Sequence, residues 1–98
     1  MAIHTITVSS LKQLLKQQAD IQLIDVREVE EYDEQRINEA RNVPLSELSD
    51  RVNEFNTADD YVIICRSGNR SHTACQLLND HGVKVTNVAG GMIEWNRP

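Results

Sequence analysis

Short apolar runs recur along this chain at intervals that suit the strands of one sheet. The first run, 3–8, alternates apolar and polar residues, whereas Ile21–Val26 is apolar enough to be covered on both faces of a sheet. A third, short run leads to Pro44, Tyr61–Ile64 is expected to be the central strand, and Val83–Val88 is expected to be the last. These runs predict five strands.

Between the runs, apolar residues take the three- and four-residue spacing of amphipathic helices. Ser9 or Ser10 is expected to cap the first helix, whose buried face carries Leu11, Leu14 and Leu15. Further helical segments are expected at 28–34, 45–55, 71–81 and 92–95. Strands that alternate with helices predict an α/β fold with a parallel sheet and helices on both of its faces.

The same spacing predicts which side chains of three helical segments face the core. In segment 28–34 the acidic residues suit a solvated first turn of a helix, whereas Val29 and Tyr32 are expected to point toward the core. Segment 45–55 places apolar residues at i, i+3, i+7 and i+10, which is one face of a continuous helix. At 92–95 the apolar side chains, Ile93 among them, should cover the edge of the core after a tight turn at two glycines.

Composition narrows the classes of protein to which the chain can belong. Its 98 residues suit one domain that spans 1–98. A formal net charge of −5 and the lack of a basic stripe argue against a nucleic-acid partner. No apolar run approaches the roughly 20 residues of a membrane span, and Met1–Thr5 has neither the basic nor the apolar part of a signal peptide. We therefore expect a cytoplasmic monomer without a membrane partner.

The cysteine and histidine residues argue against two further kinds of site. Cys65 and Cys75 are separated by a loop and suit reduced thiols better than a disulfide framework. No group of Cys and His has the spacing of metal ligands, so neither a metal nor another cofactor is expected. Cys75 lies on a predicted helix and suits the core. His72 should point away from the apolar face of that helix, which argues against a role as a base.

The most distinctive stretch follows the central strand, where the apolar run ends at Cys65. A polar loop with one glycine and two arginines comes next, and then a helix begins. This order of elements aims backbone N–H groups and the positive end of a helix dipole at the sulfur of Cys65. Gly68 allows the left-handed turn that such a nest of N–H groups needs. Arg66 and Arg70 add positive charge for an anionic co-substrate, and Arg70 is also expected to help hold the loop closed.

Cys65 should therefore be a nucleophilic thiolate rather than a buried hydrophobe, provided that several N–H groups converge on its sulfur. Lowering a cysteine pKa from about 8.5 to about 6.5 requires roughly 2.7 kcal/mol. A helix N-terminus supplies about 0.3–1 kcal/mol, whereas each hydrogen bond to a charged group can add roughly 1.5–3 kcal/mol. A thiolate formed in advance needs no histidine or carboxylate as base, which argues against a protease-type mechanism.

Four motifs together resemble a single-domain rhodanese, a thiosulfate-type sulfurtransferase, over essentially the whole chain. The motifs are Leu23–Glu28 with Glu31-Tyr32, Ala40–Leu45, Cys65–Ser71 and Gly90–Trp95. The resemblance implies a three-layer α/β domain with a five-stranded parallel sheet, in which Cys65 accepts a sulfane sulfur as a persulfide. It also implies that the loop binds the substrate and holds the persulfide with its N–H groups. These loop residues are Arg66, Ser67, Gly68, Asn69, Arg70 and Ser71.

Within this resemblance three functions stay open. The first is transfer of sulfur from a small anionic donor such as thiosulfate to a thiophilic acceptor, either cyanide or a thiol. The second is a persulfide carrier in a protein sulfur relay. The third is a non-catalytic regulatory module, against which the intact Cys65 and the loop arginines argue.

Two departures from related sequences bear on this choice. Related phosphatases and arsenate reductases have five residues between the cysteine and the arginine of the loop, whereas four separate Cys65 from Arg70. The shorter loop favours sulfur transfer. Many rhodaneses have Gly-His-Ile-Pro-Gly-Ala where this chain has Gln35–Ala40, so the conformation of that segment and its part in binding partners stay open.

Overall fold

The computed structural model describes residues 3–17 and 20–98. Met1 and Ala2, which form part of the signal-peptide argument, lie outside the described residues. Every predicted strand is present, although the first is shorter than expected. The strands are β1 (Thr5–Ile6), β2 (Gln22–Asp25), β3 (Ala40–Asn42), β4 (Asp60–Ile64) and β5 (Lys84–Val88).

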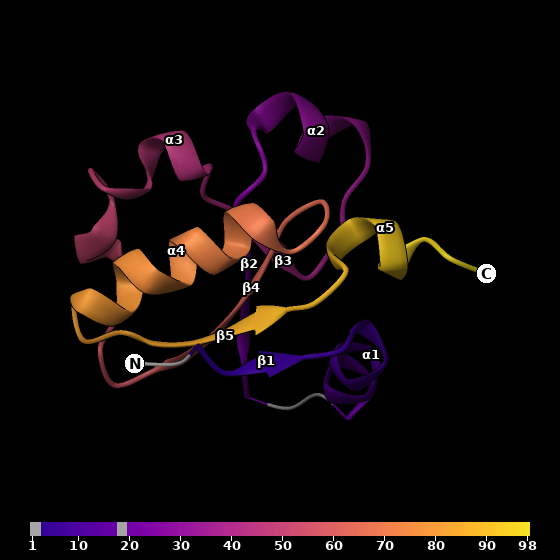
Figure 1. Cartoon of the computed structure of the whole chain (residues 1–98), viewed down its shortest axis with the longest axis horizontal. Helices are drawn as coiled ribbons and strands as arrows, with labels where there is room; N and C mark the ends of the chain where they lie inside the picture. The colour runs from indigo at the N-terminus through magenta and orange to yellow at the C-terminus, as the bar shows by residue number, and fades with distance from the viewer. Residues whose placement is uncertain (1–2, 18–19) are drawn as a thin grey trace.

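Helices connect these strands, and all five strands run parallel in the order β1-β5-β4-β2-β3 (Figure 1). The helical elements are α1 (Val8–Lys16), α2 (Val29–Glu34), α3 (Leu45–Leu48), the 3-10 turn η1 (Val52–Glu54), α4 (Asn69–Asp80) and α5 (Gly91–Trp95). The central strand is β4, as the sequence predicts. Within the described ranges, no helix is long and apolar enough to cross a membrane.

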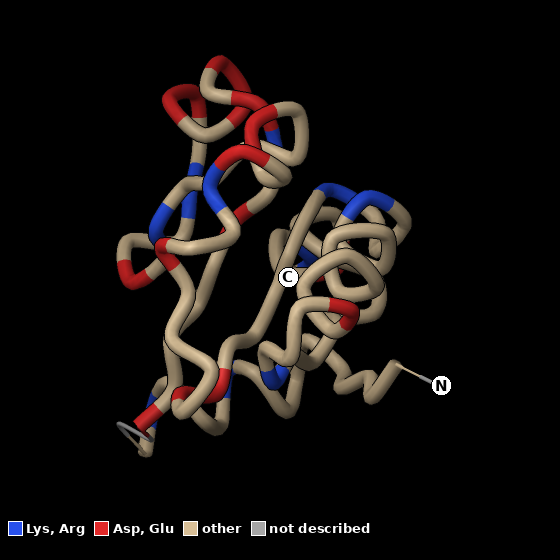
Figure 2. The backbone as a smooth tube through the Cα atoms, turned by 90° about the vertical axis from the view of Figure 1, so that its left-hand side faces the viewer, with Lys and Arg blue, Asp and Glu red and all other residues tan. Residues whose placement is uncertain are grey.

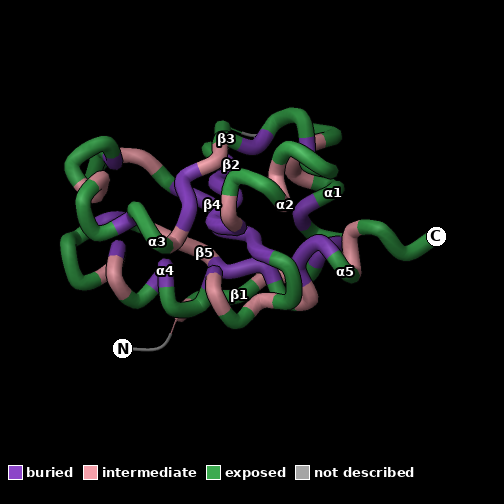
Figure 3. Tube along the Cα trace, turned by 90° about the horizontal axis from the view of Figure 1, so that it is seen from above, coloured by how far each residue is buried: buried purple, intermediate pink, exposed green. Residues whose placement is uncertain are grey.

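Alternation along β4 sends side chains into two separate cores. Tyr61 and Ile63 pack in a cluster with residues of α3 and α4, whereas Val62 and Ile64 pack in a cluster with residues of α1 and α5. Figure 3 shows these two pairs of helices on opposite sides of the strands. A parallel sheet that is buried on both faces requires strands that are apolar at almost every position. This requirement explains why the short apolar runs of the sequence predicted the strands well.

The N-cap of α1 is Thr7, so the prediction of Ser9 or Ser10 was wrong. The Thr7 side chain accepts a hydrogen bond from Ser10 N at 3.0 Å. Val8 is buried and opens the helix, whereas its apolar character had suggested the end of the preceding strand. The cap therefore lies one residue before Val8, where it can reach the first unpaired N–H groups of α1.

Segment 45–55 is not one helix, which corrects a second prediction. The helix α3 ends at Leu48, and η1 begins only after Arg51. Leu48 and Phe55 are nevertheless buried in the same cluster. Two short turns joined by a bend therefore satisfy the apolar spacing that predicted one continuous helix.

Two side chains that were expected to face the core are exposed instead. Val29 in α2 and Ile93 in α5 each expose 44% of their surface. Tyr32, also in α2, packs against the core as predicted, and its hydroxyl donates to Ala40 O. The helices α2 and α5 have only six and five residues. In such short helices a single anchoring side chain sets the orientation, and the neighbouring apolar residue can be left in solvent.

Candidate active site

Cys65 lies at the carboxyl end of β4, and Gly68 immediately precedes α4. Ligand sites of parallel α/β sheets gather at this edge. Gly68 is the N-cap of α4 and has a φ of 109°, the left-handed turn that the sequence predicts. The turn places Gly68 N at 3.1 Å from Cys65 Sγ, to which it donates a hydrogen bond. Because α4 has 12 residues and begins beside the sulfur, its dipole also favours a thiolate there.

A buried chain of polar groups continues from the sulfur. The protonated Cys65 thiol donates to Ser71 Oγ at 3.2 Å, and Ser71 Oγ donates to Asn87 Oδ1 at 2.5 Å. Once the thiol has lost its proton, the Ser71 hydroxyl can favour the charged sulfur only by turning its own proton toward it. Asn87 Nδ2 donates in turn to Gly68 O at 3.2 Å. Asn87 therefore supports both the hydroxyl beside the sulfur and the turn of the loop. Sequence reasoning missed this residue, although a polar residue inside the apolar run 83–88 was a signal that could have found it.

The pKa of the Cys65 thiol lies below its ordinary value. Burial of the sulfur acts to raise this pKa, but the Ser71 hydroxyl and the backbone N–H groups of Ser71, Gly68 and Ser67 outweigh burial because they favour the charged form. These three N–H groups belong to the loop that the sequence predicts to surround the sulfur. The result is a thiol that loses its proton readily although it is fully buried.

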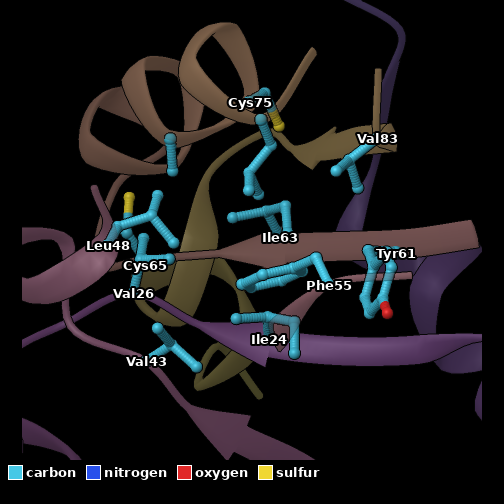
Figure 4. Packing of buried hydrophobic residues seen from close by; sticks show 12 residues of the cluster. Ile24, Val26, Val43, Leu48, Phe55, Tyr61, Ile63, Cys65, Cys75 and Val83 are labelled. Carbon is cyan, nitrogen blue, oxygen red and sulfur yellow. The ribbon is translucent and has the colours of Figure 1, made fainter. Parts of the chain in front are cut away.

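Cys75 has the opposite environment. It is buried in α4, and its pKa is raised to about 12, chiefly by burial and further by the charge of Cys65. Figure 4 shows Cys65 beside Leu48 and Val26 at one end of the core, with the sulfur of Cys75 near Val83 at the other. Only Cys65 therefore combines burial with groups that stabilise a thiolate.

The two loop arginines also differ in their surroundings. Arg70 donates to both carboxylate oxygens of Glu31 at 2.6 and 2.9 Å, which ties the first turn of α4 to α2. This hydrogen bonding lowers the pKa of Glu31 to about 2. Arg66 is exposed and, among the described residues, makes no ion pair, so its charge is available to a ligand. The side chains of Ser67 and Asn69 are exposed at the rim of the loop.

The helix α5 holds the loop from the other side. Met92 N and Ile93 N donate to Cys65 O and Arg66 O at 2.8 and 3.0 Å. Gly91 allows this close approach, because a Cβ at that position would lie 2.4 Å from Cys65 O and its φ is +53°. The tight turn that the sequence predicts at the two glycines therefore also brings α5 against the loop.

A buried ion pair lies at the end of β2. Asp25 accepts hydrogen bonds from the backbone N, Nε and Nη2 of Arg27 at 2.8–3.1 Å, and the two side chains are 0% and 6% exposed. Arg27 Nη2 also donates to Gln35 O at 2.6 Å. The Gln35 and Asn96 side chains exchange two hydrogen bonds of 2.7 and 2.8 Å. These contacts fix the start of segment 35–40, whose conformation the sequence left open.

A cleft of about 310 Å³ lies between α2 and α5, and we call it the α2–α5 cleft. It is lined by Arg66, by Arg27 after β2, and by residues of α2, α5 and their C-terminal caps, among them Glu34, Gln35 and Ile93. Because Arg66 directly follows Cys65, the cleft opens beside the loop.

No group of metal ligands completes this arrangement within residues 3–17 and 20–98. That part of the chain holds no group of three or more His, Cys, Asp or Glu that could bind a metal ion. His72 is exposed on α4, where its position in the helix predicts it. The arrangement is therefore a thiol among hydrogen-bond donors, with a free cation and a cleft at its rim.

We expect the rate at which iodoacetamide alkylates Cys65 to titrate well below about pH 8.5, the value for an ordinary cysteine. The measurement is made in a Cys75→Ser background, so that only one thiol can react. Ser71→Ala removes the hydroxyl that is hydrogen-bonded to the sulfur and lowers its pKa, so it should move the titration upward by about one pH unit or more. Ser71→Thr keeps a hydroxyl and should titrate close to the parent. A parent profile that rises only through about pH 8.5 would contradict an activated sulfur.

Comparison with known proteins identifies a family and relatives to which this chain is similar. A family model described as "Rhodanese-like domain" matches residues 7–98. YtwF of Bacillus subtilis, a candidate sulfurtransferase, is 37% identical over 95 residues, which cover 97% of this chain and 92% of YtwF. YrkF of the same organism, a candidate sulfur carrier protein, is 38% identical over 95 residues, which cover 96% of this chain and 51% of YrkF.

A solved structure has the same architecture. The crystal structure of a rhodanese-like domain protein from Staphylococcus aureus matches this fold with a TM-score of 0.91 and 34% sequence identity. The match covers 96% of this chain and 92% of that protein. The five-stranded sheet and its helices are therefore those of a fold already seen by crystallography.

Proposed function

The chain belongs to the rhodanese-like domain family, and on this premise we propose that it is a sulfurtransferase that carries sulfane sulfur as a persulfide on Cys65. The observation that carries the proposal is the environment of the Cys65 sulfur, which lies 3.1 Å from Gly68 N and 3.2 Å from Ser71 Oγ. A buried sulfur with such donors is suited to hold negative charge, which both a thiolate and a persulfide require.

In the first half-reaction the Cys65 thiolate attacks the outer sulfur of a small anionic donor such as thiosulfate. The sulfur–sulfur bond of the donor breaks, its electron pair leaves with sulfite, and a new sulfur–sulfur bond forms on Cys65 Sγ. In the second half-reaction a thiophilic acceptor, cyanide or a thiol, attacks the outer sulfur, and the electron pair returns to Cys65 Sγ. Because the Cys65 thiolate is formed in advance, the first step needs no base, and the second needs none when the acceptor attacks as cyanide or as a thiolate.

Charge repulsion is the main obstacle to the first half-reaction. Two like unit charges about 4 Å apart repel by roughly 4 kcal/mol at an effective dielectric constant near 20. The exposed guanidinium of Arg66 is suited to offset this repulsion, since Arg70 is already bound to Glu31. In this proposal Arg66 meets the donor, while Arg70 holds the loop against α2.

A persulfide carrier in a protein relay is the second candidate function. The similarity to YrkF, a candidate sulfur carrier protein, favours it. The chemistry at Cys65 would be the same, but the acceptor would be a cysteine of another protein. The two functions therefore differ in the second half-reaction and share the first.

Mass spectrometry of the intact chain tests the shared step. Incubation with thiosulfate should add one sulfur atom per chain, and later addition of cyanide should remove it. Hydrolysis of an aryl phosphate should stay at background, because the four residues between Cys65 and Arg70 form a loop too small for a phosphoryl group. Cys65-dependent phosphatase activity without sulfur uptake would overturn the proposal.

A further inference from the structure

We propose that the α2–α5 cleft binds the acceptor of the second half-reaction and that this acceptor is a small zwitterionic thiol of the cysteine type. The inference rests on the proposed function and names the substrate class of its second step. Three features of the cleft carry it, namely its position beside the loop, the charges left free on its walls and the apolar surface between them.

The cleft adjoins the Cys65 loop through Arg66, the residue that follows Cys65. Cys65 is fully buried, so an attacking group reaches the sulfur from the rim of the loop. Arg66 lines the cleft, and its carbonyl is hydrogen-bonded to Ile93 N on the opposite wall. A volume of about 310 Å³ is near the lower end for small-molecule sites. The cleft therefore suits a molecule the size of an amino acid rather than a bulky ligand.

The charges on the walls select for a zwitterion. Two of the charged residues that line the cleft are already paired, Arg27 with Asp25 and Glu31 with Arg70. The other two, Glu34 and Arg66, are exposed and make no ion pair with any residue that the structure describes. Free charges of opposite sign on one cleft fit a ligand that carries both an ammonium and a carboxylate group.

The same charges make the cleft a poor site for a dianionic donor. Glu31 and Glu34 both belong to α2, whose segment is rich in acidic residues. Figure 2 shows this concentration of Asp and Glu in the highest part of the chain, where α2 lies in Figure 1. A dianion such as thiosulfate would be repelled by Glu34, whereas the ammonium group of a zwitterionic thiol would be attracted to it.

The rest of the cleft suits a short aliphatic ligand. Met92 and the partly exposed Ile93 supply apolar surface against which methylene groups can pack. The hydrogen-bonded Gln35 and Asn96 amides join the ends of α2 and α5 beside the cleft and offer polar groups to a ligand there.

The transfer step itself needs no additional reactant. The acceptor thiolate attacks the outer sulfur of the Cys65 persulfide and forms a new sulfur–sulfur bond. The bond to Cys65 Sγ breaks and its electron pair stays on Sγ, where the donors that hold the resting thiolate receive it. The products are the Cys65 thiolate and the persulfide of the acceptor, so atoms, electrons and charge balance.

The experiment measures discharge of the persulfide-loaded chain by cysteine, by cysteamine, which lacks the carboxylate, and by 3-mercaptopropionate, which lacks the ammonium. Rates are expressed per thiolate, and we expect cysteine to react fastest. Glu34→Gln should slow cysteine and cysteamine about two- to fivefold, the effect of one exposed charge pair. It should leave 3-mercaptopropionate unchanged or faster. Glu30→Gln removes the same charge from a position of α2 that does not line the cleft and should alter none of the rates.

Two further measurements, the mass of the persulfide-loaded chain and its discharge by cyanide, distinguish a failure of this proposal from a failure of the proposed function on which it rests. A chain that takes up no sulfur contradicts the sulfurtransferase itself. A chain that loads and discharges to cyanide, but whose Glu34→Gln variant changes all three thiol rates equally, overturns the assignment of the cleft alone. Equal rates per thiolate for the three thiols in the parent chain would overturn it as well.

Discussion

We expect Cys65→Ser to abolish sulfur uptake from thiosulfate, and Cys75→Ser to take up one sulfur atom at close to the parental rate. A serine hydroxyl cannot form a persulfide, so the loss should be complete. Cys75 cannot replace Cys65, because burial raises its pKa to about 12 and leaves almost no thiolate near neutral pH. The measurement is the intact mass of each variant after incubation with thiosulfate, followed by peptide mapping of the added sulfur.

The Cys75 variant also serves as the control for folding. Both cysteines are fully buried in the same apolar cluster, so a serine at either position places a hydroxyl in the core. If both variants lost activity through unfolding, their thermal unfolding midpoints would fall together. Sulfur uptake by a folded Cys65→Ser variant, or its loss in a folded Cys75→Ser variant, would show that the nucleophile had been misassigned.

Much of the fold could be predicted because its dominant elements are buried on two sides. A strand such as β4 is apolar at every position after its first residue, Asp60, and such runs are visible in a single sequence. The errors fall where local spacing does not determine the outcome. Two errors, the bend between α3 and η1 and the exposure of Val29 and Ile93, depend on how short segments pack against the sheet. That packing involves residues far apart in the chain.

The candidate site could likewise be predicted only in part. The positions of Cys65 and Gly68 follow from one local pattern of strand, turn and helix, so the sequence predicted the loop geometry directly. Asn87 and Glu31 were missed because they reach the loop from 16 and 39 residues away in sequence, through Ser71 and Arg70. A sequence pattern within one segment cannot identify a hydrogen-bond partner from a distant segment, because the two come close only when the sheet folds.

The largest loss of stability is expected from Arg27→Met. Asp25 is fully buried and takes hydrogen bonds from the Arg27 side chain at 2.8 and 3.1 Å. The substitution leaves this carboxylate buried without its cation, which costs about 3–5 kcal/mol. That is a large share of the roughly 5–15 kcal/mol by which a small domain is stable. The measurement is the free energy of unfolding in urea. Arg97→Met breaks an exposed pair with Glu94 and should change that free energy little.

A double variant separates the unpaired charge from the lost packing of the arginine. Asp25→Leu combined with Arg27→Met removes the buried carboxylate together with its partner, so it should be more stable than Arg27→Met alone. If the single variant were as stable as the parent, the pair would contribute nothing. If the double variant were no more stable than the single one, the loss would come from packing and from the broken contact to Gln35 O. Either result would contradict the view that an unpaired Asp25 charge destabilises the end of β2.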